Sequence, residues 1–148
     1  MTEKLHLTNG IVLRSVRYGE TSLIVSVFTE LFGLQSYMLN GVRSNKKGSN
    51  KANLFQPTAL LNLVVYHNEL KQLQRIREYQ WGYVYDKILT DVRRNAIALY
   101  LIELFSKCVK QPESNPDLYH FVEDIFMHLD KASDLEAANF PLFFSLHL

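Results

Sequence analysis

The chain has 148 residues, 47% of them hydrophobic and 21% charged, which is the composition of a globular protein of one domain or two small ones. Its net charge of +1 conceals ten Lys and Arg against five Asp and Glu in residues 1–79, and six against ten in residues 80–148. No apolar run approaches the roughly 20 residues that span a bilayer and the start lacks the layout of a signal peptide, so we expect a cytoplasmic protein.

The first half of the chain predicts β-strands. Three runs of β-branched, aromatic and other apolar residues follow Gly10, separated by turns that contain Gly19 and Gly33. A nearly continuous apolar run follows a short helix that Pro57 ends. Residues 70–79 alternate like a half-exposed strand, but their periodicity does not exclude a helix. The expected strands are residues 11–17, 23–29, 34–39, 59–66 and 70–79.

The second half predicts helices, because the apolar period changes to 3.6 residues from about Trp81. One helix carries the apolar repeat that ends at Cys108. The next begins where Asn115 can cap it and Pro116 occupies its first turn. A capping box at residues 133–136 starts a further helix.

This order predicts an α+β fold in which a five-stranded OB-fold β-barrel precedes a small helical domain. We expect a nucleic-acid-binding domain at residues 1–79 and a helical domain at residues 80–148. The last residues, 140–148, are strongly apolar and no cap closes them. We interpret this end as part of an element that continues in the native protein, so that the helical domain is truncated. The alternative is a carboxy-terminal helix docked in the core.

A polar loop at residues 43–51 carries four positive charges and no acid. A curled sheet beside a flexible cationic loop can hold a phosphate backbone without catalysis, so we expect the loop to be mobile without a ligand. Tyr18 and Tyr37 can stack on unpaired bases, or pack in the barrel instead. The predicted phosphate-binding residues are Arg14, Arg17, Arg43, Lys46, Lys47 and Lys51.

No pattern predicts catalysis or a metal site. Asp124 and His128 share a helix face, but they find no third ligand and pair as ordinary helix neighbours. The chain has no Walker or Rossmann glycine-rich loop, no nucleophile elbow and no marked carboxylate pair. Cys108, the single cysteine, is expected to be buried. We expect no enzyme, no cofactor and no metal.

Several short segments stand in a recognisable order and spacing: Tyr18-Gly19-Glu20, Phe28-Thr29, Gly33, Gly41-Val42-Arg43, Leu54-Phe55-Gln56-Pro57 and Phe140-Pro141-Leu142. This ordered set resembles the amino-terminal domain of the RecO family, the bacterial recombination mediators. The family's usual Lys-Gly-Ala-Arg-Arg, however, has lost two positive charges here, at Asn40 and Ser44. Family members are also longer, often with a cysteine-rich zinc site that this chain cannot form.

The resemblance implies a non-catalytic, nucleoid-associated protein of DNA repair and recombination. Such proteins bind single- and double-stranded DNA and anneal complementary strands. Together with RecR they help to load the RecA recombinase onto DNA coated by single-strand-binding protein. The alternative is a protein-interaction adaptor with little DNA contact of its own, which the lost charges at Asn40 and Ser44 leave open.

Overall fold

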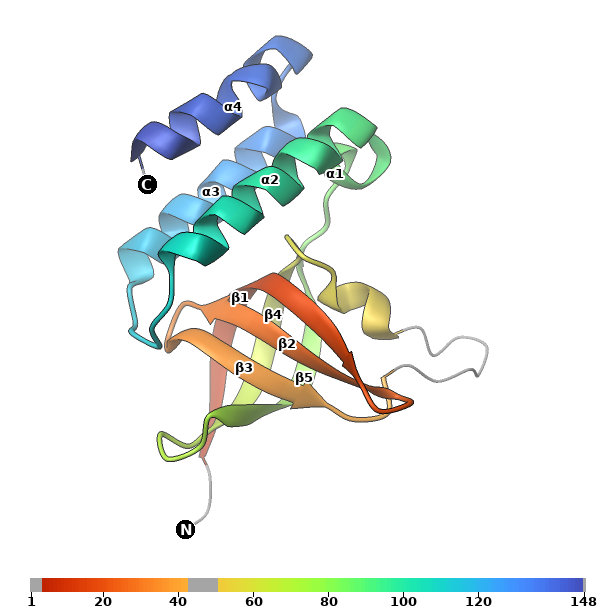
Figure 1. Ribbon diagram of the computed structural model, residues 1–148, viewed down its shortest axis with the longest axis vertical. Coiled ribbons are helices and arrows are strands. Elements are labelled where there is room, and N and C mark those ends of the chain that lie inside the picture. The colour runs from red at the N-terminus through yellow and green to blue at the C-terminus, as the bar shows by residue number, and fades with distance from the viewer. Residues whose placement is uncertain (1–3, 43–50, 148) are drawn as a thin grey trace.

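The computed structural model describes residues 4–42 and 51–147, with the side chains at 51 and 52 left out. Strands occupy the first half and helices the second (Figure 1), so the predicted α+β class is confirmed. The strands are β1 (Lys4–Tyr18), β2 (Ser22–Thr29), β3 (Gly33–Leu39), β4 (Leu60–His67) and β5 (Leu73–Tyr83). The helices are the 3₁₀ helix η1 (Lys51–Phe55), α1 (Lys87–Thr90), α2 (Val92–Cys108), α3 (Pro116–Lys131) and α4 (Asp134–His147).

The strands close on themselves in the order β1-β2-β3-β5-β4. Strand β1 is long because two neighbours share it. Its residues 4–11 pair with β4, and residues 10–18 pair with β2. This double pairing explains why the strand begins well before the expected start at residue 11. Gly10 therefore lies inside the strand, where a Cβ atom would come within 2.5 Å of the Val27 side chain.

Strand β5 removes the ambiguity left by its periodicity. It pairs with β4 from Arg75 to Tyr83 and is therefore a strand that runs beyond residue 79. Ile76, Tyr79 and Trp81 pack against the buried core inside the sheet. A neighbouring strand on each side decides between strand and helix, and that information lies outside the segment itself.

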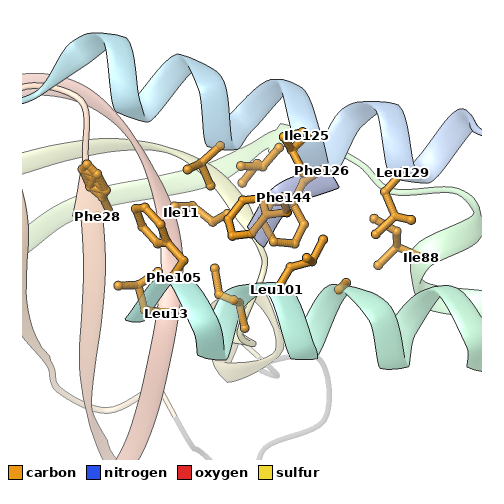
Figure 2. Packing of buried hydrophobic residues seen from close by; sticks show 14 of the residues in the cluster. Ile11, Leu13, Phe28, Ile88, Leu101, Phe105, Ile125, Phe126, Leu129 and Phe144 are labelled. Atoms are coloured by element: carbon orange, nitrogen blue, oxygen red, sulfur yellow. The ribbon is translucent and has the colours of Figure 1, made fainter. Parts of the chain in front are cut away.

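A second core joins the sheet to the helices, which lie along one side of it (Figures 1 and 2). Ile11 and Phe28 of the sheet pack there with Phe105 of α2 and Phe126 of α3, all almost fully buried. The rings of Phe28 and Phe105 stack with centroids 5.1 Å apart. The two halves of the chain therefore share one continuous apolar contact.

The predicted helix starts are confirmed by their caps. The Asn115 side chain accepts a hydrogen bond from the Leu118 N–H at 3.1 Å, and Ser133 Oγ accepts one from the Glu136 N–H at 3.3 Å. The expected burial of Cys108 is wrong, because the thiol is exposed. Cys108 is the last residue of α2 and is not among the buried residues of that helix, the last of which is Phe105.

The apolar end of the chain is divided between the core and the surface. Phe144 of α4 is fully buried and stacks on Phe121, with ring centroids 6.1 Å apart. Phe143 and Leu142 are 46% and 66% exposed. The segment thus shows neither the full burial expected of a docked helix nor full exposure of its aromatic rings.

Candidate nucleic-acid interface

The outer face of the sheet, next to the part on which α2 packs, presents two adjacent rows of side chains that cross β1, β2, β3 and β5. Residues opposite one another in register form each row, and all of them are at least partly exposed. We call these eight residues the outer rows. The first row is Arg14, Ser26, Ser36 and Leu73, and the second is Val16, Ile24, Met38 and Arg75.

Strand parity determines which side chains form this surface. The intervening residues Val25, Tyr37 and Gln74 face the interior and are buried, because successive side chains alternate between the two faces of a sheet. The middle of the outer rows holds Ile24 and Met38 beside Ser26 and Ser36, and an arginine lies at each edge. Such a surface can take up the flat face of a base while a guanidinium contacts a phosphate.

A β-bulge positions Arg14 on this surface. The register of β1 against β2 shifts between Val12 and Arg14. Leu13 is consequently buried against the helices, while its neighbour Arg14 is exposed beside Ser26. Bulges commonly re-aim side chains in this way next to functional sites.

Arg17 does not lie on the same face as Arg14. It pairs with Leu23, whose side chain belongs to the inner core, and is exposed only because it lies near the turn to β2. The two arginines predicted together are thus separated by strand parity.

The two tyrosines predicted to stack on bases differ in their exposure to solvent. Tyr18 is 56% exposed and has the parity of Arg14 and Val16, so it extends the outer surface toward the β1–β2 turn. Tyr37 has no exposed surface, and burial raises the pKa of its hydroxyl above the ordinary value. Tyr37 presents no face to a base, and its assignment to stacking is corrected: it is a core residue.

None of the four basic residues in the cationic loop has a described side chain. Arg43, Lys46 and Lys47, together with the expected mobility of residues 43–51, lie outside the described residues, and Lys51 is described only by its backbone at the start of η1. The chain reaches this loop beside the β1–β2 turn, where Ser22 Oγ donates a hydrogen bond to Asn40 Oδ1 at 3.2 Å.

Arg75 is the residue that the sequence-based prediction missed. Its alternation with Leu73 and Arg77 marks an exposed strand, but nothing local assigns it to this surface. The parallel pairing of β3 with β5 places it opposite Met38. Only a long-range pairing could have identified it.

The described residues offer no candidate metal site and no candidate membrane-spanning helix. They contain no group of three or more His, Cys, Asp or Glu side chains that could hold a metal ion. Their helices include none that is both long and apolar enough to cross a membrane.

Comparison with known families matches nearly the whole chain. A model described as "Recombination protein O N terminal" matches residues 1–85, and one described as "Recombination protein O C terminal" matches residues 89–148. The boundary between the two matches falls at residues 86–88, where α1 begins.

Individual relatives agree. The chain is 33% identical over 95% of its length to the "DNA repair protein RecO" of Christiangramia forsetii, and covers 58% of that protein. It is 34% identical over 97% of its length to the protein of the same name from Bacteroides fragilis, and covers 59% of it. The chain thus spans a little over half the length of these curated relatives.

Proposed function

This chain belongs to the RecO family, and we propose that it is a non-catalytic DNA-binding recombination mediator in DNA repair. Its relatives carry the name DNA repair protein. The proposed activities are the annealing of complementary strands and the loading of a recombinase onto single-stranded DNA. We assign residues 1–79 to an OB-fold domain that contacts DNA and residues 80–148 to a helical domain.

The outer rows carry this proposal. They place Arg14 and Arg75 at opposite edges of an apolar strip formed by Val16, Ile24 and Met38. A closed five-stranded sheet with a short helix before its fourth strand is the arrangement of an OB-fold. Proteins of that fold bind single strands through stacked bases and neutralised phosphates, largely without regard to sequence.

The remaining partners follow from the family. We propose single- and double-stranded DNA as ligands, RecR and single-strand-binding protein as direct partners, and RecA as an indirect one. The site of action is the cytoplasm, in association with the nucleoid. No cofactor is required for binding of this kind.

A salt titration tests the proposal. Binding of the chain to a fluorescent oligothymidine should weaken linearly with the logarithm of salt concentration, with a slope of about −0.7 for each phosphate neutralised. Arg14→Ala and Arg75→Ala should each make the slope shallower by about that amount. Arg93→Ala, an exposed arginine on α2, serves as the control and should change neither slope nor affinity. Binding that is absent, or that ignores salt, would contradict the proposal.

A protein-interaction adaptor is the second candidate, supported by apolar side chains on another part of the sheet. Leu5 and Leu7 of β1 are 41% and 79% exposed. They lie opposite Tyr66 and Val64 of β4, forming an apolar patch. Such a patch can bind a protein partner, and that contact should respond little to salt.

A further inference from the structure

An open groove of about 570 Å³, which we call the α2 groove, lies between α2 and the sheet beside the outer rows. Its apolar lining includes Leu34 of β3 with Leu99 and Ile102 of α2. Arg14 also lines it, so this arginine belongs both to the groove and to the first outer row. The volume falls within the range of roughly 300–1,000 Å³ that is usual for small-ligand sites.

The polar groups of the groove favour an anionic ligand. Lys107 lines the groove with Arg14, and Glu103 is the acidic residue beside them. Lys107 Nζ lies 3.7 Å from Glu103 Oε1, and the two side chains are 74% and 72% exposed. A pair this exposed is weak. Lys107 can therefore leave Glu103 and contact a phosphate with little loss of stability.

We propose that the α2 groove receives one unpaired base of a DNA strand that lies across the outer rows, with Arg14 against the adjacent phosphate. The apolar walls would take up the base, since every base has a flat face that packs on apolar or aromatic groups. This inference rests on the proposed function and names the form of DNA that the site prefers. A base held in a duplex cannot enter the groove unless its pair opens, so the groove favours single strands.

Filling the groove is the direct test. Ser106 of α2 lines it, and its Oγ donates to the Ile102 carbonyl at 2.7 Å. Ser106→Leu should lower the affinity for an oligothymidine of about 16 nucleotides by about tenfold, the loss of one stacked base. Affinity for a duplex of the same length, and the salt slope for either DNA, should not change, because no charge is altered.

Ser145→Leu is the matched control. Ser145 of α4 makes the same kind of bond, from Oγ to the Pro141 carbonyl at 2.7 Å, but lies outside the groove. It should leave both affinities unchanged, and thermal unfolding of the two variants checks that each is folded. If the unaltered chain binds single strands and Ser106→Leu binds them equally well, the groove inference is overturned while the proposed function stands. If the unaltered chain binds neither DNA, both fail.

A second measurement needs no substitution in the groove. Cys108 is the single cysteine, is exposed, and adjoins Lys107 and Val109, which both line the groove. An environment-sensitive dye on Cys108 should change its emission when oligothymidine saturates the chain, and much less when the duplex does. Equal responses to both, or a response only to an apolar peptide, would overturn the inference and favour a protein segment as the occupant.

Discussion

At the scale of single residues, Asp130 of α3 holds the helices to the end of the sheet. Its buried carboxylate accepts hydrogen bonds from the backbone N–H groups of Asp86, Lys87 and Ile88 at 2.8–3.0 Å, and from the Tyr83 hydroxyl at 3.1 Å. It thereby caps α1, whose own N-cap residue makes no side-chain bond. One side chain thus joins β5, α1 and α3.

The first prediction concerns this carboxylate. Asp130→Asn removes the charge and one acceptor oxygen, so the free energy of unfolding should fall by about 2 kcal/mol, the range for hydrogen bonds to a charged group. Urea denaturation at neutral pH measures the loss. Asp124→Asn, an exposed position on the same helix, is the control and should change stability little. Equal stability of both variants would show that Asp130 is not a structural anchor.

The second prediction concerns pH. Burial alone would raise the pKa of Asp130, but the three backbone donors and the Tyr83 hydroxyl outweigh it, so the pKa lies below its ordinary value. A lowered pKa stabilises the fold above the unfolded-state pKa of about 4. The stabilisation is lost as the pH falls through the folded-state pKa. The difference in unfolding free energy between the unaltered chain and Asp130→Asn should therefore be constant at neutral pH and shrink below about pH 4. A difference independent of pH would contradict this assignment.

Tyr18 carries the third prediction. Its ring is 56% exposed beside the outer rows, and it is not among the side chains that pack in the core of the sheet. Tyr18→Ala should weaken oligothymidine binding by about tenfold if one base stacks on it, at about 1–3 kcal/mol per base, and leave thermal stability nearly unchanged. Tyr18→Phe retains the ring and should bind normally. If both variants bind like the unaltered chain, Tyr18 is not a stacking residue.

At the scale of elements, the β2–β3 turn is the point where the sheet meets the α2–α3 connection. Gly33 has a φ of +66°, and a Cβ atom there would overlap the backbone of Glu113. His120 Nε2 lies 2.9 Å from Glu30 Oε1, and Ser114 Oγ donates to the Glu30 carbonyl at 3.3 Å. Two connections that are distant in sequence therefore pack directly on one another.

The fourth prediction compares two glycines with similar backbone angles. Gly19, in the β1–β2 turn, has a φ of +62°, and among the described residues other than its two chain neighbours no atom lies within 4 Å of an added Cβ. Gly19→Ala should lower the unfolding free energy by about 1–2 kcal/mol, the cost of the left-handed conformation. For Gly33→Ala the unfolding free energy should fall by a further ~1–3 kcal/mol, because the added Cβ atom overpacks against the Glu113 backbone. Urea denaturation of both variants measures the difference. Equal losses would show that the Glu113 backbone shifts readily to make room for the added Cβ atom.

At the scale of the whole molecule, positive charge gathers in the sheet half. Residues 1–79 hold ten of the 16 Lys and Arg. Arg14, Tyr18 and Arg75 lie on its outer surface, and the chain enters the cationic loop beside the β1–β2 turn. The helical half carries the acidic excess. An anionic strand should therefore be drawn to the sheet half, where the loop adds to the field.

The fifth prediction tests that field. Replacing Arg43, Lys46, Lys47 and Lys51 with alanine should lower affinity for single-stranded DNA by about an order of magnitude or more at low salt, and make the salt slope shallower by up to about three units. Thermal stability should stay nearly the same, because exposed charges contribute little to folding. Fluorescence anisotropy across a salt series measures both quantities. Unchanged affinity and slope would favour the protein-interaction adaptor over the DNA-binding mediator as the function of the chain.

Much of the fold could be predicted because its signals are local. Short runs of β-branched and other apolar residues mark β2, β3 and β4, and Asn115 with Pro116 marks the start of α3. The site was predicted less well. Tyr37 and Tyr18 look alike in sequence, but one lies in the core and the other on the surface. Their difference depends on strand parity within a closed sheet, which no short segment contains.

The sequence by itself determined the class of fold, the helix caps, the uneven charge and the family, since each of these depends on residue type and short-range spacing. The tertiary structure decided which side chains act together. The bulge at Arg14, the shared use of β1 and the parallel pairing of β3 with β5 build the outer rows. The packing of α2 against the sheet then forms the groove beside them. Pairing and packing bring together residues far apart in the chain, and their register depends on the whole closed sheet.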